Sequence, residues 1–403
     1  MRYQSKKIGE IASVKGGKRL PKGMFVIDEP TPHPYLRIVD FADYGIDRTN
    51  IKYIDEEAFE KTKHYTIDKN DIYISIAGSI GRVGIVPDDL SGANLTENAA
   101  KITNISGDVD HRYLMYYLHG STGQGEITNR TGGTSQPKLA LYRIAAIDFP
   151  CPPLSIQTKT ADILSAYDNL IENNRRRIQL LEQAARLLYK EWFVRLRFPG
   201  HEHTKIINGI PAGWKKKTAI EVMDVLSGGT PKTTNPAYWD GDIPFFTPKD
   251  SVDYAYVFET EKTITEEGLK NCNSKLYGRD TLFITARGTV GKINLAQRSM
   301  AMNQSCYALI ARPPLNQHFM YFALAENIEQ FRSRAVGAVF DAIIVDTFKM
   351  IPFVVPDKKI IDLFTENVLP MLLQMDNLSM QNRQLNHTRD LLLPRLMNGA
   401  IAV

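Results

Sequence analysis

Cysteine and long apolar runs are both scarce in this sequence. Only three of its 403 residues are cysteine (Cys151, Cys272 and Cys306), an odd number without the close spacing of zinc ligands. No apolar run approaches the roughly 20 residues that cross a membrane, and residues 1–7 lack the apolar core of a signal peptide. We therefore expect a protein of the reducing cytoplasm, with no membrane segment and no structural metal.

An excess of one charge is also almost absent from the chain as a whole. The sequence has 49 lysines and arginines against 45 aspartates and glutamates, and its 43% hydrophobic content is that of an ordinary globular protein. The first 24 residues are different, because they contain only Glu10 against Arg2, Lys6, Lys7, Lys15, Lys18, Arg19 and Lys22. A local positive face suits phosphate contacts, although a solvated basic surface explains the same residues.

Patterns typical of catalysis are missing as well. Gly288–Lys292 does not fit a phosphate-binding loop, because Ala286 stands where the first glycine is required and Ile293 follows the lysine in place of Ser or Thr. Asn235–Tyr238 resembles the Asn-Pro-Pro-Tyr motif of amino-methyltransferases, but no glycine-rich loop for a methionine cofactor accompanies it. We expect a turn leading into Trp239–Asp242, and we assign no catalytic residue.

What the sequence does contain is a repeat about 210 residues long. Ile8–Ile11 recurs as Ile220–Met223, and Gly78–Val83 recurs as Gly288–Ile293. The offset drifts from 212 to 204 along the chain, as small deletions in loops would cause. A chain that duplicates a domain together with a long helix is typical of a protein that reads a target in two parts.

Each copy predicts a module of mixed α and β structure. Tyr73–Ile76 and Lys101–Ile105 have the pattern of half-buried strands. Tyr113–Leu118 is a candidate amphipathic helix, and Phe319–Leu324 is its counterpart in the second copy.

A long helix is predicted after each module. In the first, Ser155 is the expected N-cap, and the helix extends to Val194 with a heptad stripe formed by Ile156, Thr160, Ile163, Tyr167, Leu170, Asn174, Arg177, Leu181, Ala184 and Leu188. The second stripe is formed by Ile361, Phe364, Val368, Met371, Met375, Leu378, Asn382 and Leu385.

The two long helices are expected to pair with each other in antiparallel fashion, as a pseudo-twofold relation between the halves requires. At an offset of 208 the two stripes stay in phase, so that Asn174 aligns with Asn382. Two asparagines in such a seam fix its register if they pair, or else lie at its wet edge. Pro370 predicts a kink or break near Leu369, and Pro394 and Gly399 mark the end of the helix.

Small, basic and amide side chains form one candidate site in each module. Lysine and arginine can contact phosphates or guanine, and asparagine and glutamine can contact adenine, although each residue alone also fits an ordinary turn or surface position. In the first module the set is Gly17, Lys18, Arg19, Lys22, Ser79, Arg82, Thr134, Ser135, Gln136 and Lys138. In the second module it is Thr230, Lys232, Thr233, Lys249, Arg287, Thr289, Lys292, Asn303 and Gln304.

Short motifs along the whole chain are similar to those of a known family. They are Gly17–Gly23, His33–Arg37, Asp40-Phe41, Gly228–Pro231, Trp239–Pro244, Thr247–Asp250, Leu188–Phe193, Phe198–Gly200, Ile210–Trp214 and Leu392–Gly399. In combination these motifs resemble the specificity subunit of type I restriction-modification systems.

The resemblance implies an α+β fold, with two repeated mixed α/β target-recognition domains separated by two long antiparallel coiled-coil helices. The expected segments are a first recognition domain (1–152), a central spacer helix (153–200), a second recognition domain (201–356) and a C-terminal spacer helix (357–403).

The resemblance also implies a non-catalytic reader of double-stranded DNA. Each recognition domain would bind one half of a bipartite asymmetric site, and the helices would set the spacer and dock two modification subunits. Those subunits would use S-adenosylmethionine, and restriction subunits with ATP and magnesium would join for cleavage, so that no cofactor is expected in this chain. Lys18-Arg19 stands where the second module has Thr230-Pro231, which predicts two different half-sites.

Two other functions remain to be distinguished from this one. A self-contained adenine methyltransferase rests on Asn235–Tyr238 alone, and predicts that the isolated chain binds S-adenosylmethionine. A transcriptional regulator or scaffold that associates through its coiled coil predicts a DNA-linked function without any methylating partner.

Overall fold

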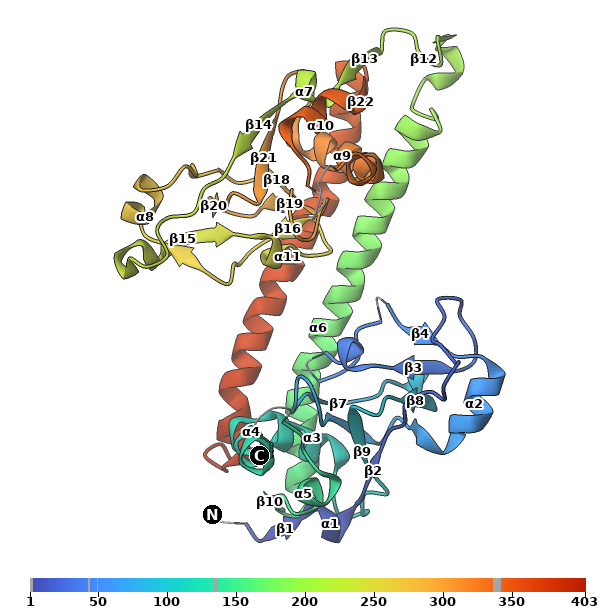
Figure 1. Cartoon of the computed structure of the whole chain (residues 1–403), viewed down its shortest axis with the longest axis vertical. Coiled ribbons are helices and arrows are strands. Elements are labelled where there is room, and N and C mark those ends of the chain that lie inside the picture. Colours follow the sequence, from blue (N-terminus) through green and yellow to red (C-terminus); the bar gives the residue numbers. More distant parts are fainter. Residues whose placement is uncertain (1–2, 43, 49, 134–136, 336–341) are drawn as a thin grey trace. The chain divides into compact units, whose positions relative to one another are not determined.

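The computed structural model divides the chain into two compact units. It describes residues 3–42, 44–48, 50–133, 137–335 and 342–403. Unit 1 consists of Met1–Glu172 with Arg383–Val403, and unit 2 consists of Asn173–Asn382. Each unit therefore combines one globular module with a part of each long helix (Figure 1).

Module 1, the globular part of unit 1, runs from β1 to β10. Its sheets have the strand orders β2-β9-β6-β7, β4-β3-β8-β5 and β1-β10. Its strands are β1 (Ser5–Lys7), β2 (Ser13–Gly16), β3 (Pro34–Leu36), β4 (Lys52–Tyr53), β5 (Thr66–Ile67), β6 (Ile72–Ser75), β7 (Val83–Ile85), β8 (Ala93–Leu95), β9 (Ala99–Thr103) and β10 (Asp148–Pro150). Its helices are α1 (Ile8–Ile11), α2 (Glu56–Thr62), α3 (His111–His119), α4 (Ser121–Arg130) and α5 (Leu141–Ala145).

Module 2, the globular part of unit 2, runs from β13 to β22 and follows a short hairpin of β11 (Ile206–Ile207) and β12 (Ile210–Pro211). Its sheets have the orders β14-β21-β18-β19-β16, β17-β15-β20 and β13-β22. Its strands are β13 (Lys215–Thr218), β14 (Met223–Ser227), β15 (Trp239–Phe246), β16 (Tyr256–Val257), β17 (Thr263–Ile264), β18 (Leu282–Thr285), β19 (Ile293–Ala296), β20 (Ala301–Met302), β21 (Cys306–Ala311) and β22 (Pro352–Val355). Its helices are α7 (Ala219–Val222), α8 (Glu266–Lys270), α9 (Gln317–Ser333) and α10 (Val345–Met350).

The two modules share one topology, as the repeat predicts. The order β2-β9-β6-β7 in module 1 matches β14-β21-β18-β19 in module 2, and parallel pairing of β3 with β8 matches that of β15 with β20. The predicted strands correspond to β6 and β9, and the predicted helices correspond to α3 and α9. The strands are not half-buried as predicted, because every residue of β6 is buried and so are four of the five residues of β9. The mixed α/β module that occurs twice is therefore confirmed.

The main helix of each module begins at a side-chain cap. The Asp110 carboxylate accepts hydrogen bonds from the first amides of α3, and the Asn316 side chain accepts one from the Phe319 amide of α9. Such caps satisfy amides that have no partner inside the helix. Behind the caps, Tyr113–Leu118 and Phe319–Leu324 are buried in the cores of their units.

The long helices are α6 (Leu154–Tyr189), which continues as a π-helical turn at Lys190–Val194, and α11 (Lys358–Met397). Within unit 2 they run antiparallel, because Asn174 donates a hydrogen bond to Gln381 (3.5 Å) while the ring of Tyr189 lies 5.7 Å from that of Phe364. No helix in the described part of the chain is both long and apolar enough to span a bilayer.

The buried stripe of α6 is displaced by one residue from the predicted one. Ile163 and Leu170 of the predicted stripe are 37% and 51% exposed, whereas their neighbours Leu164 and Ile171 are 0% and 3% exposed. Thr160 and Asn174 of the predicted stripe are buried as predicted. The displacement elsewhere is missed because other buried positions, such as Gln157 and Glu182, are polar. Gln157 donates to the carbonyl of Pro152 (2.7 Å), and Glu182 accepts from the Tyr321 hydroxyl (2.7 Å).

The displaced stripe also changes how the two helices align. Leu164 and Ile171 match the buried Val368 and Met375 of α11, at an offset of 204 rather than 208. Asn174 is therefore not the counterpart of Asn382 in the repeat. Its side chain bonds Gln381, the residue before Asn382.

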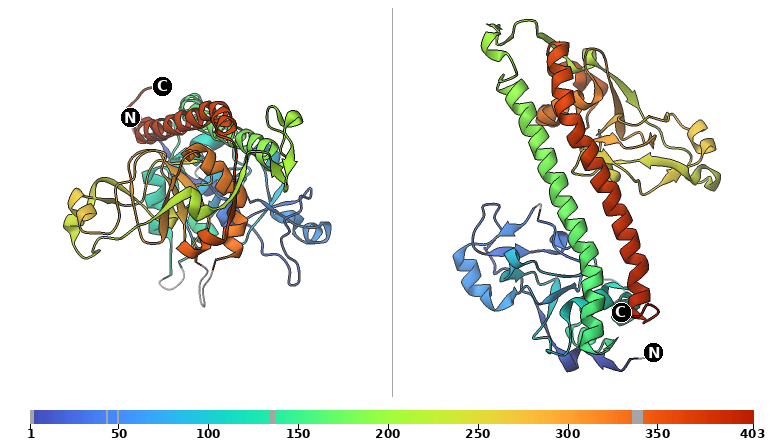
Figure 2. Two further views of the ribbon diagram at one scale, coloured as in Figure 1. Left: turned by 90° about the horizontal axis from the view of Figure 1, so that it is seen from above. Right: turned by 180° about the vertical axis from the view of Figure 1, so that it is seen from behind.

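The stripe predicted for α11 is largely correct, but the helix is not broken near Leu369. Ile361, Phe364 and Val368 are all fully buried. The C-terminal helix is continuous in both views of Figure 2. It therefore continues through Pro370, which is exposed. Water can therefore bond the backbone carbonyl that proline leaves without an amide partner.

The predicted cap of α6 is also wrong. Ser155 lies inside the helix, which begins at Leu154. The carbonyl of Pro153 accepts hydrogen bonds from the amides of Ile156 and Gln157 instead. Ser155 is thus the second residue of the helix and lies within its first turn.

Candidate nucleic-acid interface

A glycine turn between β6 and β7 places two predicted residues, Ser79 and Arg82, in module 1. The Ser75 hydroxyl donates to the carbonyl of Ser79 (2.5 Å) and accepts from the amide of Arg82 (2.8 Å). Gly78 and Gly81 have φ angles of 68° and 89°, which glycine adopts without strain. Ser79 and Arg82 are both exposed, and the Arg82 guanidinium donates to the carbonyl of Phe41 (2.9 Å).

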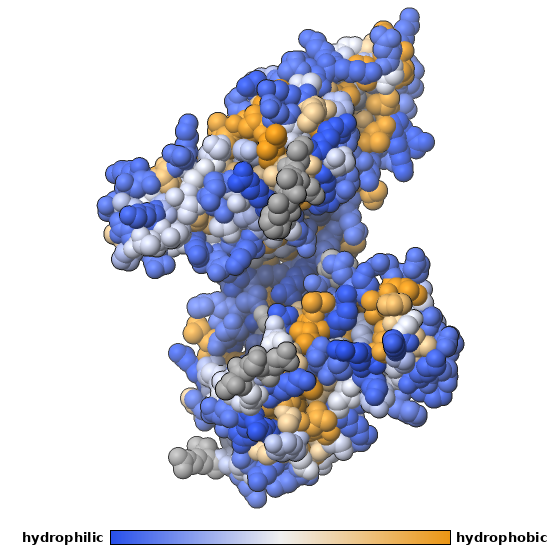
Figure 3. Space-filling view, in the orientation of Figure 1, coloured by the Kyte–Doolittle hydropathy of each residue, from blue (hydrophilic) through white to orange (hydrophobic). Residues whose placement is uncertain are grey.

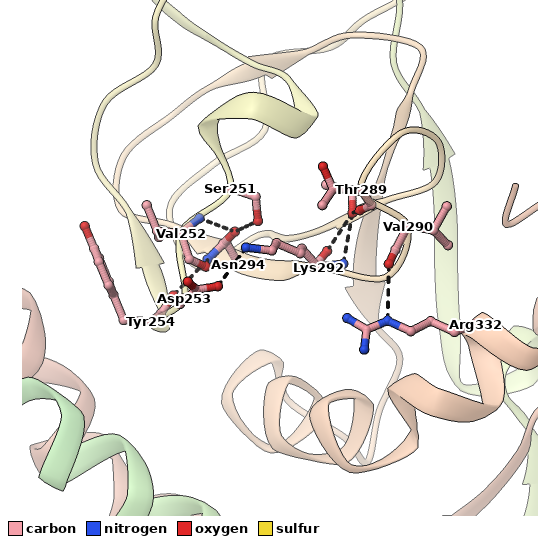
Figure 4. A network of polar contacts seen from close by, with 10 residues as sticks. Ser251, Val252, Asp253, Tyr254, Thr289, Val290, Lys292, Asn294 and Arg332 are labelled. Atoms are coloured by element: carbon pink, nitrogen blue, oxygen red, sulfur yellow. Dashed lines mark hydrogen bonds and ion pairs between the residues drawn. The ribbon is translucent and has the colours of Figure 1, made fainter. Parts of the chain in front are cut away.

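The turn between β18 and β19 in module 2 is built in the same way (Figure 4). The Thr285 hydroxyl donates to the carbonyl of Thr289 and accepts from the amide of Lys292 (2.9 Å). Here the lysine side chain forms an ion pair with Asp253 (2.7 Å), and Arg332 donates to the carbonyl of Val290 (3.2 Å). The two turns are thus equivalent in backbone and different in the partners of their basic side chains.

A buried amide holds the neighbouring loop of module 2. Asn294 accepts from the Ser251 hydroxyl (2.6 Å) and donates to the carbonyls of Val252 (3.0 Å) and Tyr254 (2.8 Å), as Figure 4 shows. Asp253 lies between these carbonyls, so that this amide fixes the position of the acid that pairs with Lys292.

A second pair of predicted residues in module 1 lies where β2 ends. The Lys18 amide donates to the carbonyl of Leu95 (2.9 Å), and the Arg19 guanidinium bonds the Glu97 carboxylate (2.7 Å). Burial raises the pKa of the Glu97 carboxyl, but the hydrogen bonds from Arg19 and Thr96 outweigh burial and hold that pKa below its ordinary value. Glu97 is therefore ionised at neutral pH.

The same place in module 2 carries a neutral pair. The Gly229 amide donates to the carbonyl of Met302 (3.1 Å), and the Thr230 hydroxyl donates to the side-chain oxygen of Gln304. Lys18 is therefore equivalent to Gly229, and Arg19 to Thr230. The comparison of Lys18-Arg19 with Thr230-Pro231 made from sequence is shifted by one residue.

The glycines of these strand ends are required for close packing. A β-carbon on Gly17 would lie 2.2 Å from the carbonyl oxygen of Thr96, and one on Gly228 would lie 2.2 Å from that of Asn303. Gly17 is thus needed for the backbone conformation of the site. If it contacts DNA, it does so through backbone atoms.

A cavity of about 490 Å³ in module 2 brings many of the predicted residues together. Those that line it are Thr230, Thr233, Lys249, Arg287, Thr289 and Asn303. The predicted Lys292 and Gln304 lie beside it on the same loops, while Lys232 is exposed and its carbonyl accepts from the indole of Trp239 (3.4 Å).

Two aromatic residues that sequence reasoning missed also line this cavity. The rings of Trp239 and Phe245 meet edge to face at 5.5 Å, and the Lys262 ammonium lies 5.6 Å from the Trp239 ring. The surface over β15 and α8 is mostly hydrophilic (Figure 3). The site thus offers cations and amides around an aromatic wall, which suits phosphates and base edges.

The remaining predicted residues of module 1 do not line a common cavity as those of module 2 do. Lys22 and Lys138 are exposed, and the backbone of Lys138 forms bridges with Gly132 and Ala77 beside the glycine turn. Thr134, Ser135 and Gln136 lie outside the described residues.

The Asn235–Tyr238 motif forms the turn that the sequence predicts. Pro236–Tyr238 is a single 3₁₀ turn leading into β15, and the Asn235 side chain accepts from the amide of Ala237 (3.1 Å). In a methyltransferase this side chain would have to bind the substrate amine, whereas here its oxygen caps a turn.

Comparisons with known proteins agree with this architecture. The model of the type I restriction modification DNA specificity domain matches residues 2–183 and 211–367. The MjaIX specificity subunit of Methanocaldococcus jannaschii is 26% identical, covering 100% of this chain and 94% of that protein. The HindI specificity subunit of Haemophilus influenzae is 22% identical over 83% of this chain and 87% of its own.

A solved structure shows the same fold. The S subunit of a type I restriction-modification system from M. genitalium superposes with a TM-score of 0.57 at 17% identity, covering 98% of this chain and 96% of that one. The predicted family is confirmed, since its model matches most of the sequence. The chain therefore belongs to the specificity subunits of type I restriction-modification systems, which recognise DNA sequence and are not themselves enzymes.

Proposed function

We propose that each module reads one half of a bipartite, asymmetric DNA target. The observation that carries this proposal is that one backbone frame occurs twice with different side chains on it. Arg19 with Glu97 in module 1 is replaced by Thr230 with Gln304 in module 2. Two readers with the same frame and different surface chemistry suit two half-sites of different sequence.

The nineteen residues predicted from sequence remain our proposal for the DNA-contacting set. The cavity of module 2 supports it most directly, because Lys249 and Arg287 lie around the same opening as Asn303. Positive side chains there would bind phosphates, and the amide would bind a base edge. Lys292 and Arg82 would first have to leave their present partners, Asp253 and the Phe41 carbonyl.

We propose further that the long helices set the length of the unspecified spacer and dock two modification subunits. Leucines that remain about half exposed on α6 and α11 support a protein partner there, since such side chains gain from being covered. They are Leu170, Leu180, Leu187, Leu373 and Leu391. The modification subunits would bind S-adenosylmethionine and methylate adenine, and restriction subunits with ATP and magnesium would add cleavage.

The spacer proposal is tested by lengthening α6. Inserting one helical turn, about four residues, after Asn174 should lengthen the tolerated spacer or disrupt assembly, because the inserted turn shifts α6 along its partner helix. An unchanged spacer with full methylation would contradict the proposal.

Mapping N6-methyladenine across a genome tests the function as a whole. Cells that supply the cognate modification subunit would be compared with and without this chain. We expect methylation at one bipartite motif that disappears when the chain is absent. Methylation that does not depend on the chain would favour a DNA-binding scaffold.

A further inference from the structure

The pairs Arg19–Glu97 and Thr230–Gln304 occupy one structural position in the two modules. The backbone bonds Lys18 to Leu95 and Gly229 to Met302 lie directly before them and are equivalent. In module 1, Arg19 follows Lys18 and bonds Glu97, which lies two residues after Leu95. In module 2, Thr230 follows Gly229 and bonds Gln304, which lies two residues after Met302. The ion pair of module 1 thus stands where module 2 has a neutral hydrogen bond.

Both members of a pair change together between the modules. A carboxylate suits a guanidinium, and an amide oxygen suits a hydroxyl. If only the backbone frame mattered, either pair would serve at both places. The coordinated change therefore points to a difference in what the outer surface of each pair must bind.

The exposed side of the module 1 pair is the arginine. Glu97 is held from both sides, because one carboxylate oxygen bonds the Arg19 Nε (2.7 Å) and the other accepts from the Thr96 hydroxyl (3.0 Å). The Arg19 side chain is 80% exposed while that of Glu97 is 29% exposed. Glu97 thereby orients a guanidinium whose terminal amino groups reach the surface.

A second position on the same frame also differs between the modules, with the charge now in module 2. The backbone amides of Arg37 and Thr247 donate to the carboxylates of Asp40 (2.8 Å) and Asp250 (2.7 Å) in equivalent short turns. Val39, which is 71% exposed, therefore stands where module 2 has Lys249. The surface around Arg19 thus differs from that around Thr230 at more than one point.

We infer that Glu97 is a specificity-determining residue of module 1, which positions Arg19 on a base of the first half-site as Thr230 positions Gln304 on a base of the second. This inference rests on the proposed function of the modules. An oriented guanidinium matches the O6 and N7 acceptors of guanine, and a glutamine amide matches the N6 and N7 groups of adenine. Arg19 therefore reads guanine and Gln304 reads adenine.

The test maps N6-methyladenine in cells that carry the chain with its cognate modification subunit. The variants are Glu97→Gln, which removes the ion pair, and the double variant Arg19→Thr/Glu97→Gln, which installs the module 2 pair. We expect Glu97→Gln to relax the preference for guanine at one position of the first half-site by about tenfold. The double variant should shift that position towards adenine, and the second half-site should stay unchanged in both.

Glu57→Gln is the matched control. Glu57 is an exposed acid on α2 that also forms an ion pair, with Lys61 (2.7 Å), but it lies away from the strand ends. Its substitution should leave both half-sites as they are. A wild-type chain that yields no bipartite motif would contradict the proposed function itself, whereas a bipartite motif that Glu97→Gln and the double variant both leave intact would overturn only this inference.

The reciprocal variant decides the matter if the module 1 variants lose all methylation. Thr230→Arg/Gln304→Glu should shift one position of the second half-site from adenine towards guanine. An unchanged second half-site overturns the inference. Loss of methylation by both double variants, with melting temperature and subunit assembly preserved, also overturns it, because a specificity residue redirects methylation and does not abolish it.

Discussion

Modules 1 and 2 are alike in the backbone of their glycine turns and unlike in the basic side chains that extend from those turns. Ser75 and Thr285 close equivalent glycine turns through hydroxyl groups, and either residue supplies the bonds required. Beyond those turns, Arg82 bonds a backbone carbonyl whereas Lys292 bonds an acid. The comparison teaches that a fixed frame leaves its exposed positions free to change, as a protein that must read different sequences requires.

The helices differ between the units in a similar way. In unit 1, Arg389 of α11 is 7% exposed, bonds Asp168 of α6 (2.6 Å) and lies 4.0 Å from the ring of Tyr44. At the offset of 204, the residues of unit 2 that correspond to Asp168 and Arg389 are Leu372 and Ala185, which are apolar and fully buried. A cross-helix hydrogen bond of unit 2, from Asn174 to Gln381 (3.5 Å), is uncharged. The two helices are thus joined by a nearly buried ion pair in unit 1, and by a hydrogen bond between two uncharged side chains at Asn174 in unit 2.

The largest effect is expected from breaking this charged contact. Arg389→Met should lower the free energy of unfolding by about 3 kcal/mol, because it leaves the partly buried Asp168 without its cation. Asn174→Ala should cost only about 1 kcal/mol. Urea unfolding of the full chain measures both. Lys358→Met, which removes an exposed ion pair with Asp362 on the same helix, is the control and should change stability little.

Replacing the glycine at the equivalent strand end of each module by alanine should cause the next largest loss of stability. The loss should be the same in both modules. Gly17→Ala and Gly228→Ala would each place a β-carbon 2.2 Å from a carbonyl oxygen, so each should cost about 1–3 kcal/mol through the displacement that follows. Thermal unfolding measures the loss. Gly107→Ala, at a glycine with open space around its α-carbon, should be tolerated. Strongly unequal losses would show that the frames are not equivalent.

A substitution on the cavity surface should affect one half-site only. Lys249→Ala should reduce discrimination in the second half-site by up to about tenfold and leave the first unchanged, because Lys249 lines the cavity of module 2. Methylation mapping with the cognate modification subunit measures both half-sites at once. Equal weakening at every site would assign this lysine to nonspecific phosphate binding instead.

The smallest effect concerns the caps of α3 and α9. Burial raises the pKa of Asp110, but its hydrogen bonds with Arg112 outweigh burial, so that this pKa lies below the ordinary value of 3.8. Its stabilising effect is therefore complete above pH 3.8 and is lost as the pH falls through the lower pKa of the folded chain.

Asp110→Asn should remove this acid-dependent loss while it retains a cap, since Asn316 caps α9 in that way. The free energy of unfolding should fall between pH 5 and pH 3 by less in the variant than in the wild type. We expect the two decreases to differ by less than about 1 kcal/mol. An identical decrease in both would mean that Asp110 does not contribute to the acid sensitivity.

The sequence predicts the repeat and the module well because both depend on local geometry. Gly78 and Gly81 recur as Gly288 and Gly291, since all four have φ angles between 68° and 89°. It predicts α6 less well, because a search for apolar residues overlooks buried polar ones such as Glu182. The partner that allows Glu182 to be buried, Tyr321, lies far along the chain.

The candidate site is predictable in part for the same reason. Basic and amide residues beside the glycine turns can be found from the repeat. Glu97, in a loop, and Trp239, at the start of β15, cannot be found in this way, because they join the site only through folding, by contacts with Arg19 and with Phe245. A comparison of the two modules at structurally equivalent positions would have found Glu97, since it aligns with Gln304.

Exchange of a whole module tests most directly whether each module reads its own half-site. A chain whose residues 5–150, from β1 to β10, are replaced by residues 215–355, from β13 to β22, would be expressed with the cognate modification subunit. Mapping of N6-methyladenine should then reveal a target with the second half-site at both ends, in inverted orientation. A methylated motif that still contains the first half-site would contradict the account.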